Sequence, residues 1–375
     1  MGSKREIMPQ HNIHTLITEL RELITLARNA AARSVNTIQI VTNFEIGRRI
    51  VEHEQQGEKR AEYGKTLLKR LSAELIREFG RGFSEDNLSN MRKFYLTYKE
   101  RSEISGTLSR KLLSSAKSQA SSGQLQKSET LSQKFTLSWS HYVFLLGVKN
   151  PEERSFYEIE ATGQNWSIRE LKRQFNTGLY ERLSLSRDKG KVKELSEKGQ
   201  IIEKPGDMIK YPYVLEFLGL DEKAAYSEND LETAIIDKLE HFLLELGKGF
   251  LFEARQKRFT FDADHFFVDL VFYNRLLRCY VLIDLKIGKL THLDLGQMQM
   301  YINYFDRHVR LKDENPSVGI VLCKMKNNAL VKLTLPENAN IYASQYQLYL
   351  PSKEELRQKL MEWAEGNEKG MKDGD

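Results

Sequence analysis

The chain is poor in cysteine and lacks long apolar runs, and both absences narrow the class of protein. Its 375 residues include only two cysteines, Cys279 and Cys323, too few for a disulfide framework. Both lie in apolar runs with strand character, where a free cysteine is expected to be a small buried hydrophobe. No segment approaches the roughly 18 consecutive apolar residues of a transmembrane helix, and the polar start MGSKREIMPQH lacks the apolar segment of a secretory signal. We therefore expect a soluble, cytoplasmic protein.

Length and charge indicate more than one folded domain and an anionic partner. A chain of 375 residues exceeds the usual size of a single hydrophobic core, so two domains are expected. Hydrophobic residues make up 40% of the sequence and charged residues 29%, which is far from the composition of a disordered chain. The net charge of +5 and the pI near 8.9 favour nucleic acid or another anion, although an excess this mild decides little alone.

Helical periodicity dominates residues 10–185, which we predict to form a helical N-terminal region. Apolar residues recur at three and four positions from Ile13 to Ala27, and a second helical run spans Val35 to Glu54. The stretch near 101–134 is rich in serine and poor in large apolar residues, so we expect a flexible connector there.

Within this region two helices joined by a glycine turn indicate a helix-turn-helix. Helices are predicted from Gly64 to Phe79 and from Glu85 to Tyr98, separated by GRGF and with Ser84 as the cap of the second. Such a second helix can enter a major groove, and a further basic helix is predicted around Arg169 to Arg182. The same arrangement is also a common packing unit, so binding of another protein or of a second copy of the chain is the alternative. The candidate nucleic-acid contacts of the second helix are Asn87, Asn90, Arg92 and Lys93.

After a polar, lysine-rich segment the pattern changes to that of an α/β domain, placed at residues 206–350. Strand-type runs replace the helical period, and the apolar run SVGIVLCK is typical of a buried strand. The chain then closes with a polar tail at 365–375, expected to fray. The predicted elements are a helix at 229–246, strands near 250–262, 265–274 and 277–288, a helix at 295–307, and the strand SVGIVLCK.

Three charged residues interrupt two of these hydrophobic strands. Asp269 lies within HFFVDLVFYN, and Asp284 lies two residues before Lys286 in CYVLIDLKIG. Because side chains alternate along a strand, Asp284 and Lys286 project from the same face. The short link at Asn274 and Arg275 predicts an antiparallel hairpin that brings Asp269 alongside. Buried charges are costly and rarely kept without a purpose, so the pattern predicts an acidic pocket that contains a lysine.

This combination suits hydrolysis of a phosphodiester bond. Mg²⁺ prefers carboxylate oxygens and retains several waters, so Asp269 and Asp284 can hold it and leave positions for a phosphate oxygen and the attacking water. Mn²⁺ is an alternative metal. Lys286 can orient or activate that water, or offset the negative charge of the transition state.

The arrangement resembles the PD-(D/E)XK nuclease superfamily. Asp269 matches the lone aspartate of the motif, and the segment from Asp284 to Lys286 matches its acid-x-lysine tripeptide. Val268 stands where the motif has proline, which weakens the match without touching a catalytic group. The resemblance implies that these three charged residues are catalytic and that the two aspartates bind the metal.

Further candidates come from the same resemblance. Gln297 and Tyr301, four residues apart in GQMQMYINYF, share one helical face and are similar to the glutamine-x-x-x-tyrosine feature of RecB-like nucleases. This implies a catalytic role for Gln297, and for Tyr301 either a nucleic-acid contact or core packing. Glu232 matches a first-helix glutamate that some relatives use as a metal ligand, although an acid there also favours the helix dipole. Gln256 and Arg258 are candidate nucleic-acid contacts, with plain solvation as the alternative.

Longer segments extend the resemblance over nearly the whole chain. They are similar to the YhcG family of nucleases, which implies an all-α, winged-helix-like N-terminal region followed by a PD-(D/E)XK restriction-endonuclease-like α/β domain. The implied activity is metal-dependent cleavage of nucleic acid in a bacterial cytoplasm, with an endonuclease acting on DNA favoured. An RNA-cleaving nuclease and a non-catalytic DNA-binding or assembly factor on a retained nuclease scaffold are the alternatives. The segments are GFSEDNLSNMRKFY, LSWSHYVFLL, NWSIRELKRQ and LLELGKGFLFEARQKRF.

Overall fold

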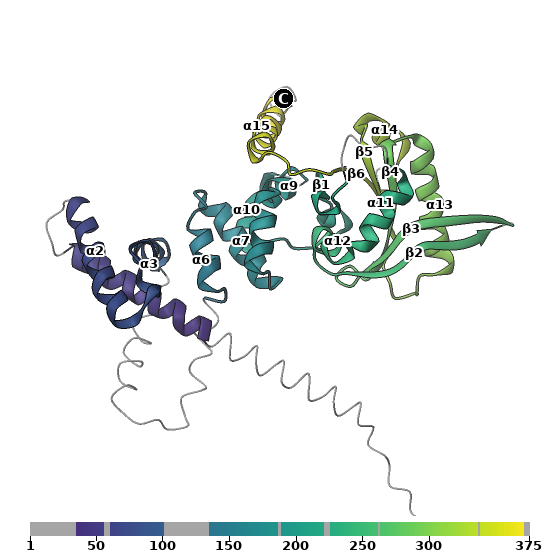
Figure 1. Ribbon diagram of the computed structural model, residues 1–375. Coiled ribbons are helices and arrows are strands. Elements are labelled where there is room, and N and C mark those ends of the chain that lie inside the picture. The colour runs from purple at the N-terminus through teal and green to yellow at the C-terminus, as the bar shows by residue number, and fades with distance from the viewer. Residues whose placement is uncertain are drawn as a thin grey trace, which may run out of the picture. The chain divides into compact units, whose positions relative to one another are not determined.

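The chain divides into two compact units, Met1–Lys149 (unit 1) and Asn150–Asp375 (unit 2). No helix in the described ranges is long and apolar enough to cross a membrane. The predicted helix from Ile13 to Ala27, the serine-rich connector and the end of the polar tail lie outside the described residues. The computed structural model (Figure 1) describes residues 35–55, 61–100, 135–186, 189–220, 226–261, 263–336 and 338–370.

The described part of unit 1 is helical. Residues 35–55 form one helix, as the sequence predicts. The predicted pair of helices with a glycine turn is also present, and Gly80 ends the first of them with a φ of 90°, a conformation that favours glycine. No strand occurs among the described residues of unit 1, so no wing of a winged helix is seen there. The further elements are α2 (Ala61–Phe79), the 3₁₀ turn η1 (Arg81–Phe83), α3 (Glu85–Tyr98) and α6 (Trp139–Leu145).

An aromatic cluster forms much of the core of unit 1. Ser84 caps α3, because its side chain accepts a hydrogen bond from the backbone N of Asn87 at 3.3 Å. Along α3 the Phe94 ring is buried, and its centroid lies 5.0 Å from the rings of both Tyr98 and Tyr142. Such tilted aromatic pairs add to the burial of apolar area. The cluster therefore packs α3 against α6 within this unit.

Unit 2 begins with helices and continues into a sheet. Gly178, with a φ of 64°, separates α8 from α9, so the single helix predicted around Arg169 to Arg182 is two. The helix predicted at 229–246 is likewise broken, at Lys238. The first elements of unit 2 are α7 (Pro151–Gly163), α8 (Ile168–Asn176), α9 (Leu179–Leu185), α10 (Lys189–Lys198), η4 (Pro205–Met208), β1 (Tyr213–Val214), η5 (Glu216–Leu218), α11 (Glu228–Asp237) and α12 (Leu239–Leu246).

The described strands of unit 2 form one six-stranded mixed sheet in the order β1-β6-β5-β4-β3-β2. β3 runs antiparallel to both β2 and β4, whereas β4, β5, β6 and β1 run parallel to one another. Figure 1 shows β2 and β3 extending beyond the other strands as a long hairpin. The remaining elements are β2 (Phe250–Phe261), β3 (Asp264–Asn274), β4 (Cys279–Lys289), α13 (His292–His308), β5 (Val318–Met325), α14 (Asn328–Thr334), β6 (Ile341–Gln347) and α15 (Lys353–Gly370).

The predicted hairpin of β3 and β4 is present, with a longer turn than expected. Asn274 pairs with Cys279, so residues 275–278 form the turn. The Asn274 side chain accepts hydrogen bonds from the backbone N of Leu276 and Leu277 at 3.0 and 3.1 Å. This side-chain cap closes the turn and sets the register in which β4 carries its charged residues past β3.

Two apolar cores cover the two faces of the sheet. On one face α11 and α12 pack Leu231 and Phe242 against strand residues such as Ile283. On the other face α13 packs Met298 and Phe305 among the residues of the second core. Because each helix buries one apolar face on the sheet, both faces of the sheet are covered, and Asp284 on β4 is buried. Cys279 and Cys323 are free and buried, as the sequence predicts.

A buried ion network ties the first helices of unit 2 to the sheet. Arg182 and Glu245 are both fully buried, and Arg182 Nη1 lies 2.5 Å from Glu245 Oε1. Arg173 Nη2 lies 3.4 Å from Glu245 Oε2, and Lys210 Nζ donates to the Glu245 backbone O. The network joins α8 and α9 to the sheet, and these helices accordingly belong to unit 2, which begins at Asn150. The sequence-based limits differ because they follow the change from helical to strand patterns. Arg173 and Arg182 serve this network, so the basic residues of this segment that remain exposed are Arg169 and Lys172.

The network predicts that Glu245→Gln destabilises unit 2 by about 3 to 5 kcal/mol at pH 7, because three cations lose a buried counter-charge. Burial disfavours the charged carboxylate, but Arg182, Lys210 and Arg173 overcome this and lower the pKa of Glu245 from 4.5 to about 2. The stabilisation of the folded state by the ionised Glu245 carboxylate is thus complete above pH 4.5 and is lost as the pH falls towards 2. Urea unfolding followed from pH 3 to 7 measures it.

The exposed acid Glu197 on α10 provides the matched control. It lies 3.9 Å from Lys193 in an exposed pair, so Glu197→Gln should change the free energy of unfolding by less than about 0.5 kcal/mol. Equal stabilities of the Glu245→Gln and Glu197→Gln variants at pH 7 would contradict a structural role for the network.

Candidate active site

The candidate site lies where β3 parts from β4. The ladder between these strands ends with the pair Leu270 and Ile283, while β3 continues along β2 to its end at Asp264. Asp269, the residue before Leu270 in β3, accepts a hydrogen bond through Oδ2 from the backbone N of Leu285 at 2.8 Å. A carboxylate thus takes the place of a strand partner. It is held against the backbone between Asp284 and Lys286.

Asp284 and Lys286 lie on the same face of β4, as strand alternation predicts. Lys286 Nζ is 2.9 Å from Asp284 Oδ2, and the Asp284 side chain is only 3% exposed. The same ammonium lies 3.6 Å from Oε2 of Glu228 in the first turn of α11. The structure therefore brings Asp269, Asp284 and Lys286 together, as expected.

The electrostatics of this cluster are those of excess carboxylate. Burial raises the pKa of Asp284 to about 7, and the charge of Asp269 adds to this shift against the opposing effect of Lys286. Burial also raises the pKa of Asp269, although the Leu285 N–H and Lys286 oppose it. For Lys286, burial favours the neutral amine, but Asp284 and Glu228 raise its pKa above the usual range. The site thus holds a charged ammonium beside two carboxyl groups that compete for protons.

Gln256 links Glu232 to this cluster. Its amide Nε2 donates to Asp269 Oδ1 at 3.1 Å and to Glu232 Oε2, while Arg255 Nε donates to the other oxygen of Glu232. Gln256 lies in the middle of β2 with a φ of 47°, a left-handed conformation that costs roughly 1 kcal/mol or more outside glycine. This conformation accompanies an amide that bridges two acids. The sequence indicated Gln256 as a candidate nucleic-acid contact, and in the structure its amide donates to the carboxylates of Glu232 and Asp269.

Gln297 and Tyr301 hold α13 to the hairpin. The Tyr301 hydroxyl donates to the backbone O of Phe267 at 2.8 Å and accepts from the Gln297 amide. Tyr301 is only 1% exposed, and burial followed by the charge of Asp284 raises its pKa to about 12. Tyr301 is therefore buried in the core with its hydroxyl engaged there, so the sequence-based alternative of core packing describes its environment. Its ring is not offered to a nucleic acid.

The donor set suits a hard divalent cation held by few protein ligands. Among the described residues no group of three or more His, Cys, Asp or Glu side chains is arranged to hold a metal. Both oxygens of Glu232 already accept hydrogen bonds, so the carboxylates that converge are Asp269 and Asp284. Two carboxylates with excess negative charge fit Mg²⁺, which keeps several waters and takes phosphate oxygens as further ligands.

Of two further neighbours of the site, one was not among the sequence-based candidates and the other was considered only as a basic residue near Gln256. Glu228 contacts Lys286, and Arg255 pairs with Glu232. A signal for Glu228 was available, because it precedes Glu232 by four residues on one helix and so shares its face. Arg255 stands next to Gln256 in a run of exposed basic residues, where no local pattern distinguishes it.

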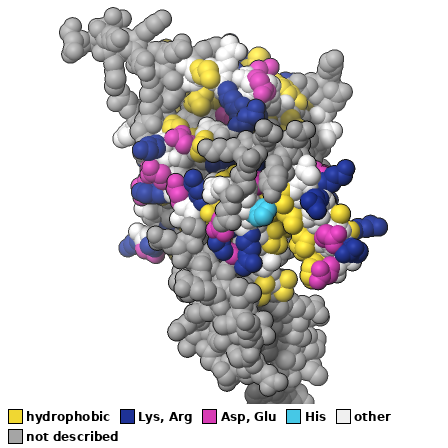
Figure 2. All heavy atoms as spheres, turned by 90° about the vertical axis from the view of Figure 1, so that its left-hand side faces the viewer, with side chains coloured by type: hydrophobic (Ala, Val, Ile, Leu, Met, Phe, Trp, Pro, Cys, Tyr) yellow, Lys and Arg dark blue, Asp and Glu magenta, His cyan; other side chains and the backbone are white. Residues whose placement is uncertain are grey.

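The remaining candidates lie on surfaces. On α3, Lys93 is exposed and Asn90 partly buried, while Arg92 Nε lies 2.6 Å from Glu54 Oε2. Figure 2 shows the face on which α2 and α3 lie, where coloured lysine and arginine side chains alternate with acidic ones rather than gather in one patch. On the hairpin, Arg258 is exposed and contacts the His265 ring, with Nη2 at 2.8 Å from Nε2.

Comparisons with known proteins define the class. Residues 206–361 match the family model of the YhcG PDDEXK nuclease domain, and residues 19–182 match that of the DUF1016 N-terminal domain. These matches define a protein with a PDDEXK-type nuclease domain. The protein named "Putative nuclease YhcG" of Escherichia coli (strain K12) is 44% identical over 344 residues, which cover 90% of this chain and 91% of that protein. The chain belongs to the YhcG family.

Two solved structures show weak likeness to parts of the chain. A repair endonuclease from Pyrococcus abyssi is 18% identical with a TM-score of 0.23, and an EndoMS–dsDNA complex is 14% identical with a TM-score of 0.24. The matches cover 34% and 36% of this chain and half the length of each of those chains. At these TM-scores neither structure bears on what this chain does.

The coupling of the two aspartates predicts that Asp269→Asn lowers the pKa of Asp284 below about 7 in metal-free protein. Burial still raises that pKa, but the negative charge that adds to it is removed. Carboxyl ¹³C chemical shifts followed between pH 3 and 9 measure the change.

Asp313→Asn, at an exposed acid paired with Arg278, is the control and should leave the Asp284 titration unchanged. An Asp284 pKa that stays near 7 in Asp269→Asn would mean that the two carboxyl groups do not interact.

Proposed function

We propose that the chain is a divalent-metal-dependent nuclease that hydrolyses phosphodiester bonds, and that its favoured activity is endonucleolytic cleavage of DNA. The observation that carries the proposal is the convergence of Asp269, Asp284 and Lys286 at the point where β3 leaves β4. Membership of the YhcG family, whose C-terminal domain is of the PDDEXK nuclease type, supports the reaction class.

Asp269 and Asp284 are the proposed metal ligands. Bound there, Mg²⁺ or Mn²⁺ would polarise a phosphoryl oxygen and lower the pKa of a bound water. The Leu285 N–H and the Gln256 amide hold the Asp269 carboxylate in place. Glu232 acts in this arrangement through Gln256 as a positioning residue, and direct ligation by Glu232 would require it to release the Gln256 or Arg255 hydrogen bond.

Lys286 acts in the proposal as a cation. A general base needs an unprotonated nitrogen near neutral pH, whereas Asp284 and Glu228 hold the pKa of Lys286 above its usual range. Its ammonium is half-buried beside the carboxylates, where water screens it less than at the surface. Lys286 therefore stabilises the negative charge that builds up on the phosphate oxygens in the transition state.

Gln297 is proposed to act through Tyr301. The hydrogen bonds from the Gln297 amide to the Tyr301 hydroxyl and from that hydroxyl to the Phe267 backbone O tie α13 to β3 just beyond Asp269. This brace keeps β3 apart from β4 at the site. Arg258 on the exposed part of β2 remains a proposed contact to the phosphate backbone of the substrate.

Unit 1 is proposed to recruit nucleic acid through α3. Lys93 is exposed, while Arg92 shares its charge with Glu54, so Lys93 and the amide of Asn90 are the main proposed contacts. The proposal includes a winged-helix-like arrangement of the N-terminal region and its contact with DNA. Binding of a protein or a second copy of the chain is its alternative.

The central test is cleavage of matched DNA and RNA in single-stranded, linear and branched forms with Mg²⁺. Asp284→Asn and Lys286→Ala should each lower the rate by at least about 100-fold, since each removes a charge that acts on the reacting phosphate. Lys289→Ala and Asp313→Asn, at exposed positions on β4 and in the loop before β5, are the controls and should retain the rate.

Equal rates for Asp284→Asn and wild type would sink the proposal, because residual cleavage would then come from a contaminant. Salt-dependent binding of nucleic acid with no metal-dependent cleavage would instead establish the non-catalytic alternative. Faster cleavage of RNA than of matched DNA would show that RNA, and not DNA, is the favoured substrate.

Metal binding should raise the melting temperature more at pH 8 than at pH 5.5. The folded-state pKa of Asp284 is raised from 3.8 to about 7, so the metal-free fold loses stability as the pH rises through this window. At pH 5.5, below the folded-state pKa of Asp284, a proton competes with the metal for this carboxylate. At a hundred times the dissociation constant Mg²⁺ stabilises the fold by about 2.7 kcal/mol, which differential scanning fluorimetry detects without any assay of activity.

Asp284→Asn is the matched variant and should abolish the increase at both pH values. A metal-induced increase that persists in Asp284→Asn, or that is the same at pH 5.5 and 8, would place the metal elsewhere.

A further inference from the structure

A groove lies between the far part of the β2–β3 hairpin and α13, beyond the carboxylate cluster. Its volume is about 330 Å³, at the lower end of the range for sites that take a small molecule. The groove is not part of the proposed catalytic machinery. Its lining includes Phe259, Phe261, Gln299, Asn303, Tyr304 and Arg307.

The floor of the groove consists of aromatic rings. Phe259 and Tyr304 are stacked, with ring centroids 4.1 Å apart and planes 18° apart. Phe261 lies two residues further along β2 on the same face and is 64% exposed. Every nucleobase has a face that can stack on an aromatic ring, which makes such surfaces tolerant of sequence. The exposed Phe261 ring, beside the stacked rings of Phe259 and Tyr304, offers a surface on which a further flat ring can stack.

The rim of the groove is polar and positively charged. The amides of Gln299 and Asn303 lie 3.2 Å apart and offer both donors and acceptors, as the edge of a base requires. Arg307 is exposed, and within the described part of the chain it is paired with no carboxylate. None of the lining residues is acidic. This rim suits a base with its phosphate better than the apolar face of a protein.

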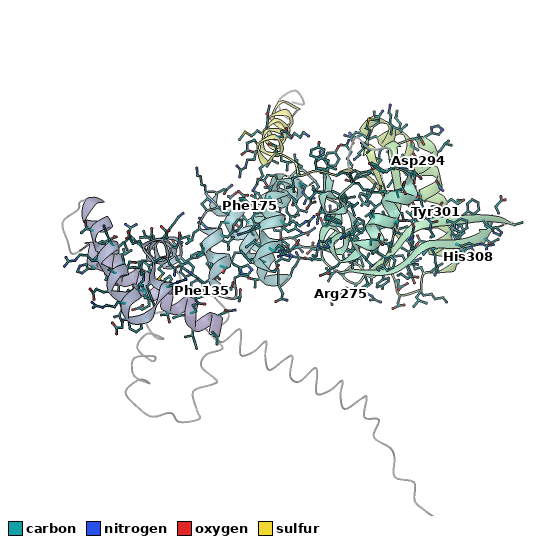
Figure 3. All side chains as sticks on the ribbon, in the orientation of Figure 1. Phe135, Phe175, Arg275, Asp294, Tyr301 and His308 are labelled. Carbon is teal, nitrogen blue, oxygen red and sulfur yellow. The ribbon has the colours of Figure 1, made fainter. Side chains whose placement is uncertain are left out.

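The groove and the candidate active site both involve α13, because Asn303 and Tyr304 line the groove while the Tyr301 hydroxyl contacts β3 near Asp269. Figure 3 labels Tyr301 and His308, which lie on α13 beside the hairpin. Tyr304 follows Gln297 by seven residues, which is about 10 Å along a helix at about 1.5 Å per residue.

We propose that this groove holds an unpaired nucleobase of the substrate strand, near the phosphodiester bond that is cleaved. Bases inside a duplex stack on one another, whereas single-stranded or extruded bases expose their faces to aromatic side chains. The substrate class is therefore nucleic acid with a single-stranded segment or an unpaired nucleotide beside the scissile bond. This inference rests on the proposed nuclease function.

The test measures base binding without cleavage, on the full chain in EDTA. The probe is a single-stranded oligonucleotide with one 2-aminopurine, whose fluorescence is quenched when the base stacks. Phe261→Ala should bind this probe roughly tenfold more weakly and lose the quenching, because stacking on one ring is removed. Binding of a blunt duplex should stay as in wild type.

Two further variants separate stacking from other effects. Leu251→Ala is the control, since Leu251 is a large apolar side chain that is 52% exposed at the other end of β2, ten residues from Phe261. It should bind the probe as wild type does. Phe261→Tyr should retain binding and quenching, whereas Phe261→Leu, which keeps an apolar side chain without a ring, should behave as Phe261→Ala.

Wild-type affinity and quenching in Phe261→Ala, or in Phe261→Leu, would overturn the inference. A change in the mass of the full chain in solution on Phe261→Ala, with unchanged affinity for the probe, would overturn it in favour of an interface between copies. Failure of the proposed function is a separate result. Base binding that depends on Phe261, together with no Mg²⁺-dependent cleavage, would overturn the nuclease and leave the groove a base-binding site.

Discussion

The site depends on one hydrogen bond, from the Leu285 backbone N to the Asp269 carboxylate. It replaces the strand partner that β4 loses when β3 turns away with β2, and a buried N–H without a partner would be costly there. The parting of the strands frees the hairpin to extend beyond the sheet. Gln256 from β2 and Tyr301 from α13 then hold the diverging strand from two sides.

The two buried acid clusters of unit 2 show opposite balances of charge. Glu245 lies among Arg182, Arg173 and Lys210, which keep it ionised and lower its pKa, so it serves to join helices to the sheet. Asp284 lies beside a second carboxylate with one ammonium nearby, and its pKa rises towards neutrality. A buried acid with a surplus of cations is satisfied, whereas one with a deficit gains from a further cation. This difference in balance separates the structural cluster from the candidate catalytic one.

Much of the α/β domain was predictable because strand and helix periods are local properties. The strands, the hairpin of β3 and β4 and the shared face of Asp284 and Lys286 follow from alternation. The breaks at Gly178 and Lys238 were missed, because each interrupts an apolar pattern that continues on both sides. The depth of burial of Arg182 was also invisible, since its partner Glu245 lies 63 residues away and no local pattern joins them.

The sequence by itself determined which strands carry the charges and that Asp284 and Lys286 share a face, since a period of two needs only neighbouring residues. Tertiary structure decided that β3 leaves β4 at Asp269, that Gln256 joins the carboxylates, and that Tyr301 is a brace inside the core. It also decided which arginines are buried counter-ions. These outcomes depend on where strands pair and part, and such pairing is set by contacts between segments far apart in the chain.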